Sequence, residues 1–244
     1  MLIGSFFSIS LKKPVFIGFL LTKEFFIGII QIRIFLNPYY CFDKFMIINW
    51  LGGLSVRLQD KTSSDGIIVL INPVNAASEG AIVAWTNPEE KNKKVKGTPF
   101  TINCAGEYDT AGVLIEGIDS YPEEAAAKNL KADNLIYRVE IDDISVVHLG
   151  ALSRPLTDDQ LGKLSGVDVL LVPIGGDKMI DASQAAAVVA RIEPRLVIPI
   201  GYDKEEQSEK FIKQLGVTPT REDKLRLTKK DLPQEEMELV ILTN

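Results

Sequence analysis

Imidazole and thiol groups are scarce in this chain. Its 244 residues contain one histidine, His148, and two cysteines, Cys41 and Cys104. Two cysteines form no disulfide framework, which suits a reducing compartment, and we expect a cytoplasmic protein. Zinc takes three or four nitrogen, thiolate or carboxylate ligands. A zinc site built from thiols and imidazole alone would need all three of these residues. Cys41 lies in an N-terminal segment unlike the rest of the chain, which argues against such a site.

Other catalytic signatures are also missing. The chain has no G-x-S-x-G elbow, and a serine nucleophile would have only His148 as its base. It has no Walker A loop, and PIGGDK (173–178) lacks the spacing of a nucleotide fingerprint. The net charge of −6 and pI near 5.0 argue against a nucleic-acid-binding surface, and the basic run KNKKVKG (91–97) is typical of a solvated loop.

Residues 1–45 differ in composition from the rest of the chain. They hold nine of the eleven phenylalanines and no alanine, and their net charge is +3, against −9 for residues 46–244. The apolar stretch 14–36 has the length of a membrane span, but Lys23, Glu24 and Arg33 interrupt it, and each central charge costs about 2.5–3.5 kcal/mol on insertion scales. No small-residue cleavage site supports a secretory signal. We expect this leader to lie outside the fold, as a mis-assigned start or alternatively as a membrane anchor.

From residue 46 onward, short β-strand patterns come first and helices later. Strands are predicted at 46–51, 55–59, 66–71, 81–85, 99–103 and 112–118, and 134–141 and 144–149 form a hairpin around the two-residue loop Asp142–Asp143. Capping boxes, Thr157 with Gln160 and Asp181 with Gln184, begin predicted helices at 157–164 and 181–192, and a third helix is predicted at 204–215. Apolar strands at 167–174, 195–200 and 237–242 alternate with these helices, so the sequence predicts an α/β layered fold over 46–244.

Four motifs in this region carry a resemblance to a known family. They are GEYDTAGV (106–113), VVHLGAL (146–152), VDVLLVPIGG (167–176) and EPRLVIPIGYD (193–203). In order and separation they resemble the metallo-β-lactamase superfamily, most of all its small hydrolases related to ascorbate-phosphate lactonase. The resemblance implies a four-layer αβ/βα sandwich with an active site at the loops along one edge of the two sheets. It also implies hydrolysis assisted by two metal ions, usually zinc.

The residues that would hold those metals are absent. Against the family's T-H-x-H-x-D-H motif this chain has Thr86 followed by Asn87, Glu89, Lys91 and Asn92 at the ligand positions. Ala151 stands at the aspartate of H-L-G-D-L, and Gly201 at the histidine of I-P-x-H-Y. Two neighbouring polar positions are Gly53 and Asn72 instead of histidine and aspartate. Neutral amides are poor zinc ligands and a lysine reverses the local charge, so we expect no zinc cofactor.

The expected function is therefore that of a pseudoenzyme that binds a small molecule or a protein. The alternative is a divergent lactonase, esterase or phosphodiesterase with a rebuilt metal site, for which Glu89, Glu90 and Glu107 could supply carboxylates to Mg²⁺ or Mn²⁺. Lys91 could instead replace the missing metal charge and bind an anion. Glu107 and His148 are possible pocket residues, although in the family the histidine of H-L-G-D-L is not a metal ligand. We expect His148 to be part of the scaffold, and a membrane partner only if residues 1–45 are part of the protein.

Overall fold

The computed structural model describes residues 24–27, 30–33, 44–61, 66–74, 81–89, 95–97, 99–120 and 134–243. The chain divides into two compact units, Met1–Phe42 and Asp43–Asn244. In the first unit, β1 (Glu24–Ile27) and β2 (Ile30–Arg33) form an antiparallel hairpin. No helix in the described part of the chain is long and apolar enough to cross a membrane. The placement of residues 1–45 outside the fold stays a prediction.

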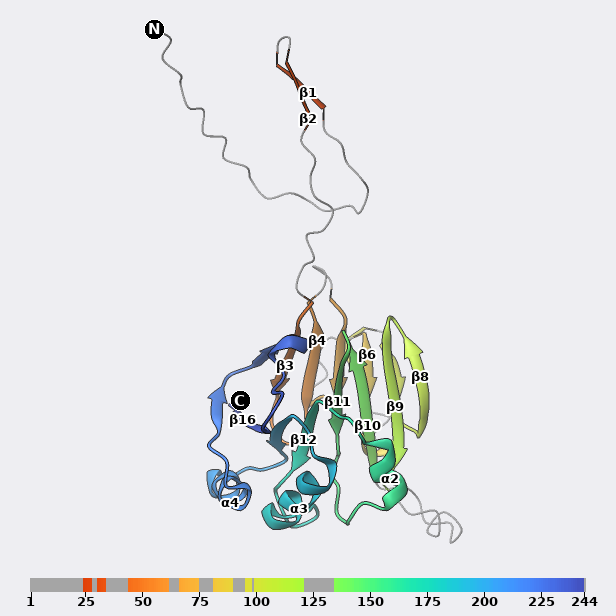
Figure 1. Cartoon of the computed structure of the whole chain (residues 1–244). Helices are drawn as coiled ribbons and strands as arrows, with labels where there is room; N and C mark the ends of the chain where they lie inside the picture. The colour runs from red at the N-terminus through yellow and green to blue at the C-terminus, as the bar shows by residue number, and fades with distance from the viewer. Residues whose placement is uncertain are drawn as a thin grey trace. The chain divides into compact units, whose positions relative to one another are not determined.

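The second unit contains two stacked β-sheets (Figure 1). The six-stranded sheet has the order β15 (Leu225–Leu227), β3 (Met46–Trp50), β4 (Val56–Asp60), β5 (Ile68–Ile71), β6 (Ile82–Ala84) and β7 (Phe100–Ile102). The eight-stranded sheet has the order β14 (Thr220–Glu222), β16 (Glu238–Leu242), β13 (Leu196–Ile200), β12 (Val169–Pro173), β11 (Ile144–His148), β10 (Leu135–Ile141), β9 (Val113–Asp119) and β8 (Gly106–Thr110). Both sheets are mixed, and β11, β12, β13 and β16 run parallel.

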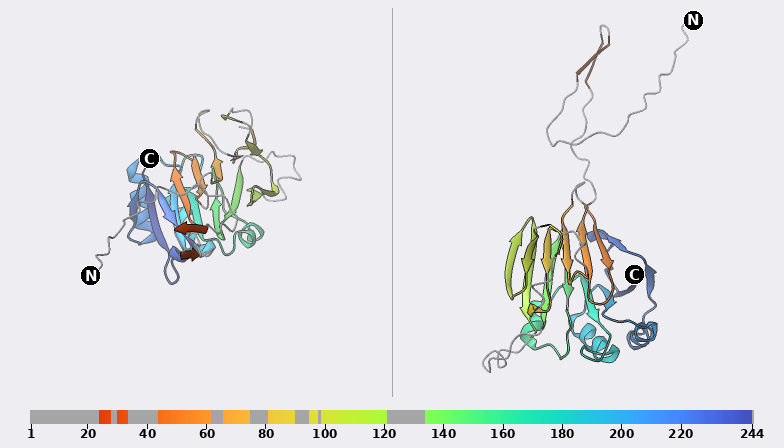
Figure 2. Two further views of the ribbon diagram at one scale, coloured as in Figure 1. Left: turned by 90° about the horizontal axis from the view of Figure 1, so that it is seen from above. Right: turned by 180° about the vertical axis from the view of Figure 1, so that it is seen from behind.

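Helices cover the outer face of the eight-stranded sheet. They are α2 (Asp158–Lys163), α3 (Ala182–Ile192) and α4 (Glu205–Leu215), with a short 3₁₀ turn, η2 (Lys229–Asp231), before β16. Figures 1 and 2 show these helices on the side of that sheet away from β3 and β4. The α/β sandwich fold class is thereby confirmed. On the outer face of the six-stranded sheet, the described residues form a small apolar cluster of Leu70, Val83 and Trp85.

The burial of both faces explains why the central strands are apolar throughout. In β11, Val146 packs between the two sheets and Val147 packs under the helices. In β12, Leu171 faces the inter-sheet core and Leu170 faces the helices. Successive side chains of a strand point to opposite faces, so a strand covered on both sides needs apolar residues at every position.

The local signals in the sequence have the predicted geometry. Asp142 and Asp143 both have positive φ, 52° and 64°, as a two-residue hairpin loop between β10 and β11 requires. The side chain of Thr157 accepts a hydrogen bond from the Gln160 amide, and both predicted capping boxes are present. The strands β8, β14 and β15 of this unit were not predicted from the sequence, and neither were β1 and β2 of the first unit.

Candidate functional site

The loops that would surround a metal meet at one edge of the sandwich. The amide of Gly201, directly after β13, donates a hydrogen bond to the carbonyl of Gly53 at 2.8 Å. His148, at the end of β11, reaches the carbonyl of Leu54 at 3.0 Å. Gly53 and Leu54 belong to the turn between β3 and β4, so these bonds join the two sheets. The loops at which the family resemblance implies a site therefore lie together at one edge of the two sheets.

His148 is fully buried, and both of its ring nitrogens are engaged. Nδ1 accepts a hydrogen bond from the Gly150 amide at 2.9 Å, so this nitrogen carries no proton. Nε2 then bears the proton and donates it to the Leu54 carbonyl. Burial lowers the pKa of His148 to about 4, which keeps the ring neutral near pH 7. The lone pair that a metal would need is used by a backbone amide.

Asn72 stands where the family has an aspartate and forms a local polar bridge. Its backbone has φ of 50°, a left-handed conformation that asparagine tolerates better than most residues. Its Oδ1 accepts from the Thr86 amide at 2.9 Å, and its Nδ2 donates to the Thr86 hydroxyl at 2.9 Å. The bridge joins the end of β5 to the residues after β6.

Ala151, at the position of the family's bridging aspartate, offers only a methyl group. Its amide donates to Oδ1 of Asn134 at 2.7 Å, and Nδ2 of Asn134 donates to the Leu149 carbonyl at 3.0 Å. Asn134 is 3% exposed, so both bonds are shielded from water. No role was predicted for Asn134 from the sequence. The available signal was a polar residue directly before the apolar run LIY (135–137).

The space beside Gly201 is occupied by apolar side chains. A β-carbon built at Gly201 would lie 2.9 Å from Cδ2 of Leu54 and 3.3 Å from the sulfur of Met179. Trp50 stacks on Tyr202 close by, with ring centroids 4.9 Å apart. A histidine at this position would therefore have to displace Leu54 and Met179. Neither residue was identified as part of the site from the sequence.

Gly53, the other glycine at a former polar position, is in a different environment. A β-carbon there would have no neighbour within 4 Å. Its carbonyl nevertheless accepts two hydrogen bonds, from Gly201 and from Nε1 of Trp50, both at 2.8 Å. The turn at Gly53 is thus fixed through its backbone and open on its side-chain face.

The remaining predicted residues are placed only in part. Oδ1 of Asn87 accepts from the Glu89 amide at 2.9 Å, which closes a local turn at the surface. Glu107 lies exposed on the edge strand β8, paired in register with Glu116 of β9. Lys91, Asn92 and Glu90 lie outside the described residues. Among those that are described, no group of three or more His, Cys, Asp or Glu side chains could hold a metal ion.

The donors that the described residues offer at this edge do not fit two zinc ions. Ala151 and Gly201 have no side-chain donor, and the amide oxygens of Asn72 and Asn87 accept backbone hydrogen bonds. The imidazole of His148 is held inside the core. This edge can therefore offer a ligand backbone hydrogen-bonding groups and apolar side chains. The loops that carry them are already connected to one another.

Comparisons with known proteins agree with the architecture. The model of a beta-lactamase superfamily domain matches residues 47–201. A UPF0173 metal-dependent hydrolase of Pyrococcus horikoshii is 28% identical over 99 residues, 40% of this chain and 44% of that protein. A UPF0173 protein of Pyrococcus furiosus is 41% identical over 73 residues, 29% of this chain and 33% of that protein. The matched stretches thus span less than half the length of these curated relatives.

A solved structure shows the same fold over most of the chain. It is a protein from Thermotoga maritima assigned to the Zn-dependent hydrolases of the metallo-β-lactamase superfamily, with a TM-score of 0.67 and 24% identity. The match covers 81% of this chain and 98% of that protein. With the family model covering 47–201, the chain belongs to the metallo-β-lactamase superfamily.

Proposed function

We propose that this chain has lost the two-metal hydrolysis of its superfamily. We propose also that it binds a small molecule or a protein partner at the sheet edge where Gly53, His148 and Gly201 lie, which we call the former metal edge. The observation that carries the proposal is the filling of the site. Where a histidine would project from residue 201, Leu54 and Met179 occupy the space. A fold can keep its loops and change its function, because function depends on site residues rather than on architecture.

The polar groups of the edge support the same proposal. Asn72, Asn134 and His148 each connect two segments of backbone, and none of the three carries a charge near pH 7. Hydrogen bonds and apolar contacts therefore hold the loops that metal coordination would hold in a hydrolase. Loops held in place in this way bind a ligand without a large ordering cost.

The second candidate is a hydrolase with a rebuilt site. The description of the Pyrococcus horikoshii relative as a metal-dependent hydrolase favours it. Such a site would have to use carboxylates, and Glu89 and Glu107 are the described ones near the relevant motifs. The hydrogen bond in the local turn with Asn87 uses the backbone amide of Glu89 and not its carboxylate.

Metal content and hydrolysis distinguish the two functions. The full chain is purified without chelators from medium supplemented with zinc, manganese and iron, and its metal content is measured by inductively coupled plasma mass spectrometry. We expect less than about one tenth of an equivalent of each metal, and no turnover of p-nitrophenyl acetate, a homoserine lactone or bis-p-nitrophenyl phosphate above the uncatalysed rate. Stoichiometric metal together with activity that EDTA removes would overturn the proposal.

The variant Glu89→Gln/Glu107→Gln separates a rebuilt carboxylate site from contaminating activity. If hydrolysis belongs to these carboxylates, the variant loses both metal and turnover; under our proposal it behaves as the parent does.

The proposed partner is not a nucleic acid, because the chain carries a net charge of −6. The proposed location is the cytoplasm, where Cys104, a free and exposed thiol, would stay reduced.

A further inference from the structure

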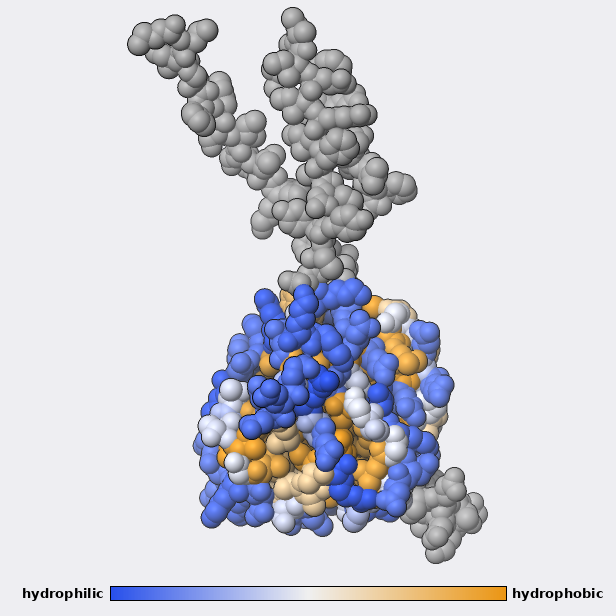
Figure 3. Space-filling view, in the orientation of Figure 1, coloured by the Kyte–Doolittle hydropathy of each residue, from blue (hydrophilic) through white to orange (hydrophobic). Residues whose placement is uncertain are grey.

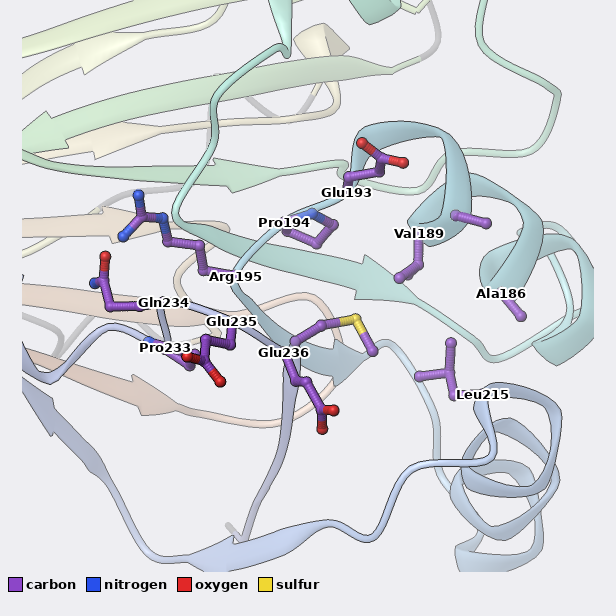
Figure 4. A pocket seen from close by; sticks show the side chains of 12 residues that line it. Ala186, Val189, Glu193, Pro194, Arg195, Leu215, Pro233, Gln234, Glu235 and Glu236 are labelled. Atoms are coloured by element: carbon purple, nitrogen blue, oxygen red, sulfur yellow. The ribbon is translucent and has the colours of Figure 1, made fainter.

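A recess lies at the other end of the eight-stranded sheet from Gly201. Gly201 follows the carboxyl end of β13, whereas this recess includes Glu193–Arg195, directly before the amino end of the same strand. Its volume is about 480 Å³, within the range of ligand-binding pockets. Figure 4 shows it between the last turn of α3, the end of α4 and the loop that leads into β16. We call it the α3–α4 groove.

The floor of the α3–α4 groove is apolar. Its apolar lining residues come from α3, α4 and the loops before β13 and β16: Ala186, Val189, Ala190, Pro194, Leu215, Pro233 and Met237. Several are only partly buried, Ala186, Leu215 and Met237 among them, so apolar surface is accessible within the recess. On the face shown in Figure 3, apolar residues reach the surface between polar ones in the region of α3 and α4.

The rim of the groove carries excess negative charge. Glu193, Glu235 and Glu236 line it and are exposed, and no ion pair joins their carboxylates to another described residue. The single cation in the lining, Arg195, lies 3.7 Å from the buried carboxylate of Asp168, which partly neutralises it. The carboxyl ends of α3 and α4 also meet here, and a helix carries partial negative charge at that end.

We propose that the α3–α4 groove is a docking site for a basic, amphipathic peptide segment of a partner protein. An apolar side chain of the segment enters the floor, and flanking lysine or arginine side chains face Glu193, Glu235 and Glu236. Charge complementarity of this kind sets specificity and association rate, and it weakens as salt rises. The site lies at the opposite edge from the former metal positions, so it does not depend on whether that edge has lost its activity.

The test uses a labelled, acetylated and amidated peptide, Lys-Leu-Arg-Leu-Lys, titrated with the full chain and followed by fluorescence anisotropy at 50 mM and 300 mM NaCl. We expect saturable binding that weakens several-fold at the higher salt concentration. The double variant Glu235→Gln/Glu236→Gln should raise Kd about five- to tenfold, because two exposed charges contribute modestly each. Ala186→Trp, which fills the floor, should raise Kd at least as much.

A matched variant controls for the net charge of the protein. Glu206→Gln/Glu222→Gln removes two exposed carboxylates outside the groove and should leave Kd within about twofold of the parent value. A peptide with glutamate in place of each basic residue should not bind. The proposal is wrong if both double variants weaken binding equally, if the acidic peptide binds as well as the basic one, or if no binding is detected at 1 mM protein. The last result would leave the former metal edge unaffected as a candidate site.

Discussion

Replacing Gly150 by alanine tests whether the former metal edge is closed by the Asn134 bridge. Gly150 has φ of 62°, and a β-carbon there would lie 2.1 Å from Oδ1 of Asn134, 2.8 Å from the Leu135 carbonyl oxygen and 2.9 Å from Cβ of Thr86. The Leu135 carbonyl belongs to a central strand and cannot easily move. The Asn134 side chain must therefore turn away and release the amide of Ala151.

The expected loss of stability has three parts. The left-handed backbone costs alanine about 1–2 kcal/mol. Overpacking adds about 1–3 kcal/mol. A buried hydrogen bond left unmade adds about 1–3 kcal/mol. Gly150→Ala should thus reduce the free energy of unfolding by about 3–8 kcal/mol, which is a large part of the stability of a typical domain.

Gly53→Ala is the matched control, because its φ of 52° is similar and its β-carbon would have no neighbour within 4 Å. It should cost only the backbone part, about 1–2 kcal/mol. Both variants are compared with the parent by urea unfolding, with the slope m checked for a common unfolding transition. Equal losses in the two variants would refute the reasoning, because they would show that the space at Gly150 is as open as the space at Gly53.

Three further predictions concern charge and packing. The pKa of His148 is 6.5 in the unfolded chain and about 4 in the folded one, so between these values the unfolded state binds one more proton. The contribution of His148 to the free energy of unfolding is therefore complete above pH 6.5 and falls by about 3 kcal/mol toward pH 4. His148→Gln should remove this pH dependence from urea unfolding measured between pH 4 and pH 6.5. Asp168→Asn should cost about 1–3 kcal/mol by urea unfolding, because this carboxylate is buried and faces Lys229 and Arg195. Asp158→Asn should cost less than about 1 kcal/mol, because 98% of the Asp158 side chain is exposed. Equal costs of the two variants would contradict this prediction. Gly201→Ala should cost about 2–3 kcal/mol by urea unfolding, between the other two glycine variants, because its φ is positive and the atom that its methyl group meets is the mobile end of Leu54; a cost equal to that of Gly53→Ala would show that the space beside Gly201 is not filled.

The parts of the fold that the sequence revealed are those determined by neighbouring residues. The hairpin loop at Asp142–Asp143 and the capping box at Thr157 depend on short-range geometry, and both were predicted with nearly correct bounds. The strands that were missed depend on distant partners. β15 (Leu225–Leu227) pairs with β3 (Met46–Trp50) across most of the chain, and no local pattern of three residues can show that pairing. β8 is an exposed edge strand of mixed polarity, so it lacks the alternation of a half-buried strand.

The candidate site shows the same difference between features that the sequence reveals and features that depend on distant residues. The absence of donors at Ala151 and Gly201 is visible in the sequence once the family motifs are aligned. The side chains that lie beside these two positions are not visible in the sequence, because Asn134, Leu54 and Met179 come from three separate segments and reach Ala151 and Gly201 only in the folded chain. The sequence could therefore show that these two positions carry no donor, but not which side chains lie beside Gly201.

Under the proposed loss of the metal site, the loops at this edge stay connected without an ion. In a two-metal hydrolase the ions connect segments from both sheets, so removing the ligands alone would leave those segments without a link. Here the Gly53 and Leu54 carbonyls accept bonds from Gly201 and His148, which connect the same two sheets without an ion. Each bond contributes only about 0.5–1.5 kcal/mol, but all of them lie in one small region together with the bridges of Asn72 and Asn134. An edge held in this way keeps a defined surface, and the proposed binding of a small molecule or a protein depends on such a surface.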